Sequence, residues 1–351
     1  MYKPETLVVI TPAFPENESA TWWVPSQQLM VRALQENYPG TRIVVLALLY
    51  PYHQNVYQWH GIDVQAFDGT HKRKAKRLLL YQQVWATLRS LRKHHQLIGL
   101  FSFWSGECAF IGQYFGRLHA IRHISWICGQ DARKENRWVR YIRPRSHQLA
   151  AMGASLRDLY QHSHGVRPLH LVPNAIDQRV FPADLPAVRD IDVMAAGSFE
   201  PLKQYDLYAK VVGALQQSIP ALKAIHCGLG REKEKVEAVI GELQLQDHLS
   251  LLGGLPHAEV LQLMQRSKVF LHTSRYEGCS TVCLEALYAG AHVISFCYPF
   301  DHPVAHWHVV SNADEMEQKA LELLSDASLP HERILYHSMN DSARTVMQLF
   351  K

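Results

Sequence analysis

The sequence predicts an α/β protein with two Rossmann-like domains, each built around a doubly wound parallel sheet. Three observations lead to this prediction. The chain has 351 residues, about twice the size of a common domain. Short apolar runs alternate with segments of helical period, which is the pattern of βαβ units. The alternation restarts after a break rich in Pro and Asn, so we expect the second half to repeat the architecture of the first.

The apolar runs of the first half define its expected elements. They are short enough to be strands, and the stretches between them carry apolar residues at helical spacing. Strands are expected over residues 7–10, 43–49, 97–101 and 123–127, and helices over 25–37, 72–93 and 107–119.

The second half shows the same alternation with shorter and more regular loops. Strands are expected over residues 191–196, 222–227, 249–252, 269–272 and 291–296, and helices over 205–218, 231–244, 257–266 and 281–289. Two further helices are expected after about residue 315, on either side of a break at residues 328–330.

The break between the halves lies at Val172-Pro173-Asn174, a composition that suits a hinge. We therefore expect an N-terminal domain over residues 1–174 and a C-terminal domain over residues 175–334. The last helix, about residues 335–351, is expected to pack back on the N-terminal domain.

Composition and charge narrow the class of partner. With 47% hydrophobic and 19% charged residues, the chain is too apolar for intrinsic disorder. The net charge of +4 hides an asymmetry, because residues 1–175 hold 21 Lys and Arg against 10 Asp and Glu (+11), whereas the rest hold 15 against 22 (−7). The modest total argues against a nucleic-acid binder.

The basic half is where an acceptor is expected to enter. Its excess of positive charge predicts an anionic acceptor, or one that lies at an anionic surface such as a membrane. The basic run at residues 71–77 is interpreted as an exposed helix face, and a contact with a membrane surface or a phosphate is the alternative.

The cysteines, the histidines and the N-terminus point to a protein of the reducing cytoplasm. Six scattered cysteines form no C-x-x-C pair, so we expect neither a disulfide scaffold nor a zinc site. The 21 histidines show no helical pair with a third ligand, and we predict no metal. We expect no signal peptide and no membrane span, because the apolar runs are too short. The expected location is the cytoplasm, or peripherally the inner face of a membrane.

Three junctions between a strand and the next helix in the second half are rich in Gly and polar residues. In open α/β sheets ligands bind at the carboxyl ends of the strands, near helix N-termini that attract anions. The first junction holds Gly197, Ser198 and Lys203, and Lys203 supplies a point charge for a phosphate. The second is a G-x-G turn that begins at Gly228, for which a simple tight turn is the plainer interpretation.

The third junction carries the most information. The backbone amides of Gly278, Cys279, Ser280 and Thr281 lie where a helix is expected to start, and would face a diphosphate. Two carboxylates flank them: Glu277 in the loop, and Glu285 in the expected helix amid apolar neighbours. An uncompensated buried carboxylate is costly, so we expect Glu285 to accept hydrogen bonds from vicinal ribose hydroxyls.

The segment from Glu277 to Glu285 resembles the Glu-x7-Glu signature of the retaining glycosyltransferases of family 4. The resemblance is strongest over residues 191–297 and has support at residues 172–177. It implies the GT-B architecture, in which two Rossmann-like domains face a cleft that binds a nucleotide-sugar. The N-terminal domain would then take the acceptor and the C-terminal domain the donor.

The resemblance also implies roles for single residues. Glu285 resembles the glutamate that binds the ribose, and Glu277 the one beside the transferred sugar. Lys203 and Gly197 resemble the lysine and glycine of the diphosphate loop. Gly254 lies in a segment that resembles the loop whose backbone holds the base, although a simple turn is an equal alternative.

Two positions depart from the family pattern. Ser198 stands where the family usually has an arginine, so one phosphate cation is missing at that position. In the first domain the segment Cys128-Gly129-Gln130-Asp131 resembles a His-Gly-x-Asp pattern, with Cys128 in place of the histidine. A small buried side chain is the plainer interpretation of Cys128. Asp131 remains, and the resemblance implies that it lies near the reacting groups.

These observations predict a metal-independent retaining glycosyltransferase, with hexosyl transfer as the expected reaction. We expect no cofactor beyond the co-substrate, which is a nucleoside diphosphate sugar. The expected acceptor is a hydroxyl of a glycan or a lipid-linked acceptor. Glu277, Lys203 and Asp131 are the catalytic candidates. The alternatives are a non-catalytic relative that binds nucleotide-sugars or glycans, and a nucleotide-sugar epimerase.

Overall fold

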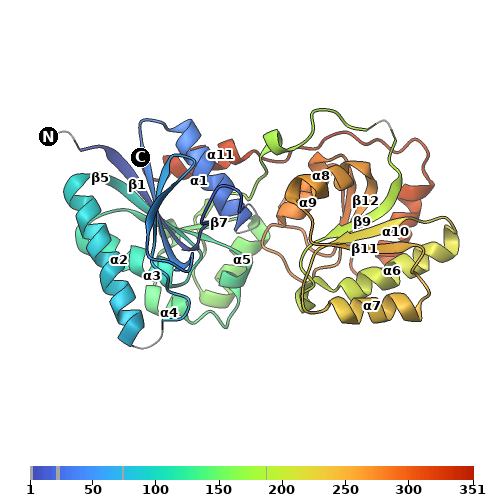
Figure 1. Cartoon of the computed structure of the whole chain (residues 1–351), viewed down its shortest axis with the longest axis horizontal. Helices are drawn as coiled ribbons and strands as arrows, with labels where there is room; N and C mark the ends of the chain where they lie inside the picture. Colours follow the sequence, from blue (N-terminus) through green and yellow to red (C-terminus); the bar gives the residue numbers. More distant parts are fainter. Residues whose placement is uncertain (1–2, 21–23, 73–74, 187) are drawn as a thin grey trace. The chain divides into compact units, whose positions relative to one another are not determined.

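A computed structural model describes residues 3–20, 24–72, 75–186 and 188–351 of the chain (Figure 1). The chain folds into two compact units. Unit 1 comprises residues 1–175 together with 337–351, and unit 2 comprises residues 176–336. Among the described residues, no helix is both long enough and apolar enough to cross a membrane.

Unit 1 is built on an eight-stranded sheet. Its strands are β1 (Glu5–Ala13), β2 (Arg42–Tyr50), β3 (Val56–Trp59), β4 (Ile62–Ala66), β5 (Gln96–Phe103), β6 (His123–Ile127), β7 (Leu149–Ala151) and β8 (His170–Leu171). They are arranged in the order β3-β4-β2-β1-β5-β6-β7-β8. All neighbouring strands are parallel except β3 and β4, which form an antiparallel pair at one edge.

Helices cover both faces of this sheet, because alternate side chains of its buried strands point to opposite sides. The helices are α1 (Pro25–Asn37), α2 (Ala75–His94), α3 (Glu107–His119), α4 (Trp138–Ile142), α5 (Ala154–His164) and α11 (Met339–Gln348). On one face Val8 of β1 packs in a core with Val84 of α2 and Phe115 of α3. On the other face the ring of Phe350 lies against Phe101 and over Gly99, which leaves no room for a side chain there.

Unit 2 is built on a six-stranded, wholly parallel sheet. Its strands are β9 (Ile191–Ala196), β10 (Ala224–Cys227), β11 (Leu249–Gly253), β12 (Ser267–His272), β13 (His292–Ser295) and β14 (Trp307–Val309). Their order is β11-β10-β9-β12-β13-β14. The chain runs outward from β9 to β11 and then returns to place β12 on the other side of β9. In a doubly wound sheet this reversal of direction opens a crevice at the carboxyl ends of the two central strands.

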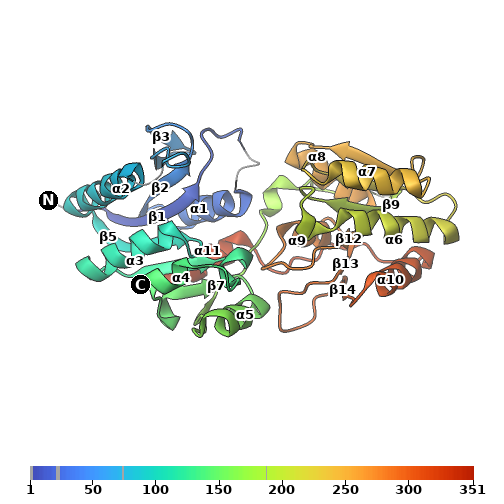
Figure 2. The same ribbon diagram turned by 90° about the horizontal axis from the view of Figure 1, so that it is seen from below.

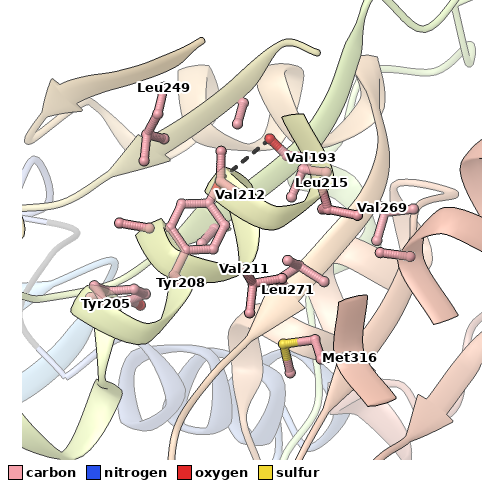
Figure 3. Close-up of a cluster of buried hydrophobic side chains, with 14 of the residues drawn as sticks. Val193, Tyr205, Tyr208, Val211, Val212, Leu215, Leu249, Val269, Leu271 and Met316 are labelled. Atoms are coloured by element: carbon pink, nitrogen blue, oxygen red, sulfur yellow. Dashed lines mark hydrogen bonds between the residues drawn. The ribbon is translucent and has the colours of Figure 1, made fainter. Parts of the chain in front are cut away.

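The larger core of unit 2 lies between the sheet and three of its helices (Figures 2 and 3). The helices of unit 2 are α6 (Tyr205–Ser218), α7 (Lys233–Glu242), α8 (His257–Arg266), α9 (Thr281–Tyr288) and α10 (Ala313–Ser325). Val193 of β9 and Leu271 of β12 are fully buried in one cluster with Met316 of α10. The hydroxyl of Tyr208 donates to the carbonyl oxygen of Ile225 at 2.8 Å, which ties α6 to β10.

The predicted fold class is confirmed, since both units are α/β with doubly wound parallel sheets. The predicted helices over 25–37, 107–119, 205–218 and 257–266 match α1, α3, α6 and α8. The sequence prediction misses the hairpin of β3 and β4, which occupies part of the stretch between the second strand and the second helix. Its strands are four and five residues long, too short for a clear period of two.

Candidate functional site

The loops that follow β9 and β12 are held together at the carboxyl edge of the unit 2 sheet. The hydroxyl of Thr273 donates to the carbonyl oxygen of Lys203 at 2.7 Å. The amide of Arg275 donates to the carbonyl oxygen of Leu202 at 3.1 Å. Two of the three predicted junctions, 70 or more residues apart in sequence, therefore form one surface at the switch point of the sheet.

Glu277 lies at the centre of this surface between two basic side chains. The ammonium group of Lys203 donates a hydrogen bond to Glu277 Oε1. On the other side, His272 Nε2 lies 3.5 Å from the same oxygen. The Lys203 and Glu277 side chains are 22% and 20% exposed, so most of the pair is shielded from solvent.

This arrangement fixes the charge of the carboxylate. Burial raises the pKa of Glu277, but the bonds to His272 and Lys203 outweigh burial and lower this pKa to about 2. Burial lowers the pKa of His272, whereas its interactions with Cys283 and Glu277 outweigh burial and raise this pKa to about 9. At neutral pH Glu277 is therefore a carboxylate that can accept hydrogen bonds and cannot donate a proton.

The same histidine reaches the start of helix α9. His272 Nε2 lies 3.2 Å from the hydroxyl of Ser280, the residue that precedes the helix. The Ser280 side chain makes no capping bond to α9. Gly278 and Cys279 are buried in the preceding loop, and Thr281 is the first helical residue. The predicted diphosphate segment thus forms the N-terminal end of α9, where backbone amides favour an anion.

Glu285 lies one turn further along α9. Its side chain is 11% exposed, and its Oε1 lies 2.8 Å from Nε2 of His257, the first residue of α8. The hydrogen bond to Glu285 outweighs burial and raises the pKa of His257. The second glutamate therefore has a partner on α8, next to the loop that the sequence predicts for the base.

Glycines allow the loops after β9, β10 and β11 to approach one another closely. The amide of Gly197 donates to Cys227 O at 2.9 Å, and the amide of Gly228 donates to Gly253 O at 2.7 Å. Gly228 has a φ of +154°, and a Cβ atom placed there would lie 1.9 Å from the carbonyl oxygen of Gly197. A Cβ atom at Gly254 would meet the side chain of Leu229. Gly228 therefore has a packing reason to be glycine.

The position in unit 2 that departs from the family pattern is exposed. Ser198 lies on the surface beside Gly197. A cation does come close to the same loop, because Arg231 forms a 2.9 Å ion pair with Glu200. Both side chains of that pair are largely exposed, at 69% and 46%, so the pair holds its geometry weakly.

Asp131 lies in unit 1 and is engaged by the backbone. Its Oδ1 accepts from the amide of Ser105 at 2.9 Å and its Oδ2 from the amide of Cys128 at 2.8 Å. These amides belong to the loops after β5 and β6, so Asp131 ties together two loops at the carboxyl edge of that sheet. Burial raises the pKa of Asp131 to about 6, and burial also raises the pKa of the Cys128 thiol. The catalytic role of Asp131 stays a prediction.

Two histidines of the site are absent from the sequence prediction, which weighs histidines only as metal ligands. In the structure His272 and His257 each contact one of the two glutamates. The sequence carries a signal for His272, because it ends the apolar strand Val269-Phe270-Leu271. A polar residue at the carboxyl end of a buried strand is placed to reach a ligand site. Among the described residues, no group of three or more His, Cys, Asp or Glu side chains is arranged to hold a metal ion.

The solved structures that share this arrangement of two sheets are GT-B glycosyltransferases, and this chain has their fold. Sucrose-phosphate synthase from Thermosynechococcus elongatus has a TM-score of 0.73 at 14% identity, over 99% of this chain and 95% of that chain. The Anabaena protein HepE, solved in complex with UDP and glucose, has a TM-score of 0.64 at 14% identity, over 98% and 94%.

The sequence comparisons are more specific. Residues 178–345 match the family model of glycosyl transferases group 1, so the chain contains a domain of this group. One relative belongs to the phosphatidylinositol N-acetylglucosaminyltransferase of Homo sapiens, of which it is a subunit. It is 31% identical over 126 residues, which are 36% of this chain and 26% of that protein. The match thus spans about a quarter of the length of this relative.

Proposed function

We propose that the protein is a metal-independent glycosyltransferase that moves a sugar from a nucleoside diphosphate sugar to a hydroxyl acceptor and retains the anomeric configuration. The observation that carries the proposal is the pairing of Lys203 with Glu277 beside the N-terminal end of α9. Glu285 lies on the same helix and contributes a second, mostly buried carboxylate. A cation, a helix N-terminus and two carboxylates are groups that suit the recognition of a sugar diphosphate.

The reaction makes its main demand at the leaving group. The bond between the anomeric carbon and the diphosphate oxygen breaks, the acceptor oxygen bonds to the same carbon, and the acceptor proton passes to the leaving phosphate. Lys203 and the amides at the start of α9 would stabilise the charge that develops on that phosphate. These groups would fill the role that a divalent cation has in other phosphate sites.

The two glutamates would have different tasks. Because its pKa is about 2, Glu277 would act as an ionised acceptor for sugar hydroxyls and stabilise positive charge near the anomeric carbon. It would not act as the general acid. Glu285 would accept the ribose hydroxyls and share or exchange its bond with His257. Asp131, in unit 1, would keep the loops after β5 and β6 in place on the acceptor side.

The relatives suggest which donors and acceptors to test first. UDP accompanies glucose in the Anabaena structure, and the human relative is named for transfer of N-acetylglucosamine to phosphatidylinositol. UDP-sugars are therefore the first donors to test, and a lipid-linked or glycan hydroxyl the first acceptor class. The excess of positive charge in residues 1–175 favours an anionic acceptor. The six free cysteines support a reducing, cytoplasmic location.

A donor panel tests the proposal. Thermal unfolding of the full chain is measured with UDP-, GDP- and ADP-sugars, and a specific donor raises the midpoint because it binds only the folded state. Glu285→Ala should lose this shift. Glu242→Ala, which removes an exposed carboxylate at the end of α7, should keep it. Absence of any shift together with absence of sugar transfer or release would refute the proposed function.

One observation favours a second candidate, a relative that binds the nucleotide-sugar without turning it over. Ser198 and Cys128 stand where the family pattern has a cation and a histidine. Calorimetric binding of a donor without transfer to any acceptor, and without release of sugar, would support this alternative. Detectable transfer would exclude it.

A further inference from the structure

Helix α2 carries apolar side chains on two opposite sides. On the inner side Leu80, Val84 and Leu88 are fully buried in the core of unit 1. On the outer side Leu78 and Leu79 are 63% and 56% exposed. Covering the sheet accounts for the inner residues only, and two adjacent leucines in water are unfavourable. The outer leucines therefore call for an apolar partner.

The charges on α2 are of one sign. Its twenty residues include Lys76, Arg77, Arg89, Arg92 and Lys93, and none is Asp or Glu. Arg77 is used internally, because its guanidinium bonds the carboxylate of Glu107. The other four cations are exposed. Any partner of this face should accordingly be anionic.

A stripe along the outer face combines these two properties. It lines a shallow hollow of about 600 Å³ and consists of Leu78, Tyr81, Gln82, Trp85 and Arg89, which recur at helical spacing. The guanidinium of Arg89 lies over the ring of Trp85, 5.9 Å from its centroid. Leucine, tryptophan and arginine in one stripe match the boundary between lipid headgroups and acyl chains, where Trp is enriched and cations meet phosphates.

The position of the helix adds a third point. α2 lies on the outside of unit 1 (Figures 1 and 2). Its first turn is near the carboxyl edge of the sheet, because Arg77 bonds both Gly69 O, in the loop after β4, and Glu107, the first residue of α3. Leu78 and Leu79 are thus at the edge where an acceptor is expected to enter unit 1.

We propose that the outer face of α2 binds the surface of an anionic lipid bilayer. Leu78 and Leu79 would insert at the headgroup level, and Arg89, Arg92 and Lys93 would contact lipid phosphates. A nucleic acid would explain the cations but leave the leucines unexplained. The proposal does not depend on the glycosyltransferase assignment, because it concerns a surface and not the reaction.

Vesicle binding by the full chain tests the proposal. The protein is sedimented with vesicles of phosphatidylcholine alone and with vesicles that contain about 30% phosphatidylglycerol, in about 0.1 M and about 0.5 M salt. We expect binding to the anionic vesicles only, and weaker binding at the higher salt. Failure to bind the anionic vesicles at the lower salt would overturn the proposal.

Variants locate the contact. Leu78→Ser with Leu79→Ser should weaken vesicle binding at least tenfold. Leu169→Ser changes a leucine of similar exposure, 60%, just before the edge strand β8, and should leave binding unchanged. All three substitutions are on the surface, so circular dichroism should show folded protein. Equal binding by the α2 variant and the wild type would place the contact elsewhere and overturn the proposal.

The charged part of the contact has its own variants. Arg92→Gln with Lys93→Gln should weaken binding to anionic vesicles and reduce its salt dependence. Lys210→Gln, which removes an exposed cation of α6 in unit 2, should bind as the wild type does. Loss of binding in the Lys210 variant to the same extent would show unspecific charge attraction and contradict a defined α2 surface.

Discussion

Glu277→Gln is expected to destabilise unit 2 by about 3 kcal/mol at pH 6. The pKa of Glu277 is lowered from its ordinary 4.5 to about 2, and each pKa unit corresponds to about 1.4 kcal/mol. Gln resembles the protonated form of Glu in shape and lacks its charge. The side chain is only 20% exposed, so solvent screening removes little of this stabilisation.

The pH dependence gives the prediction its sign. Because the folded-state pKa of Glu277 is depressed, its contribution is present above pH 4.5 and is lost as the pH falls towards about 2. His272 has the opposite dependence: with a pKa raised from 6.5 to about 9, its contribution is present below pH 6.5 and is lost as the pH rises through about 9. Both shifts describe one ion pair and are not added.

The assay compares wild type and variant between these limits. Urea unfolding is followed by hydrogen exchange of peptides from β12 and α9. The gap between the two proteins should be about 3 kcal/mol at pH 6 and about half as large at pH 3. Glu200→Gln, in the exposed pair with Arg231, should change stability by less than about 1 kcal/mol. A Glu277 variant as stable as wild type at pH 6, or a gap equal at both pH values, would refute the reasoning.

Three other substitutions test parts of the two units. Gly228→Ala should cost more than about 3 kcal/mol in urea unfolding, because its Cβ would lie 1.9 Å from Gly197 O, whereas Gly241→Ala, in α7 with no atom within 4 Å of its Cβ, should gain about 0.5 to 1 kcal/mol; equal effects would contradict the packing. Ser198→Arg should tighten UDP binding about fivefold in calorimetry, in a salt-sensitive way, and Ser198→Gln should not. Asp131→Asn should destabilise unit 1 by about 2 kcal/mol in thermal unfolding, since an amide nitrogen would face a backbone N–H in place of a carboxylate oxygen; unchanged stability would remove its positioning role.

The sequence alone determined much of the fold. Its apolar runs and helical periods are long and regular enough in unit 2 to place β9, β12, α6 and α8 within a few residues. It also identified Lys203, Glu277 and Glu285 as candidates, because small residues, a cation and carboxylates follow the strand ends. The hairpin of β3 and β4 escaped prediction because such short strands carry little periodic signal.

Only the tertiary structure decided which of these residues meet. Lys203 and Glu277 are 74 residues apart, and they touch because the sheet order places β12 directly beside β9. The same order brings His272 onto Glu277 and sets His257 of α8 on Glu285 of α9. Local sequence specifies where a strand or helix begins. Side-chain partners, and the pKa values they produce, depend on packing between segments that are distant in the chain.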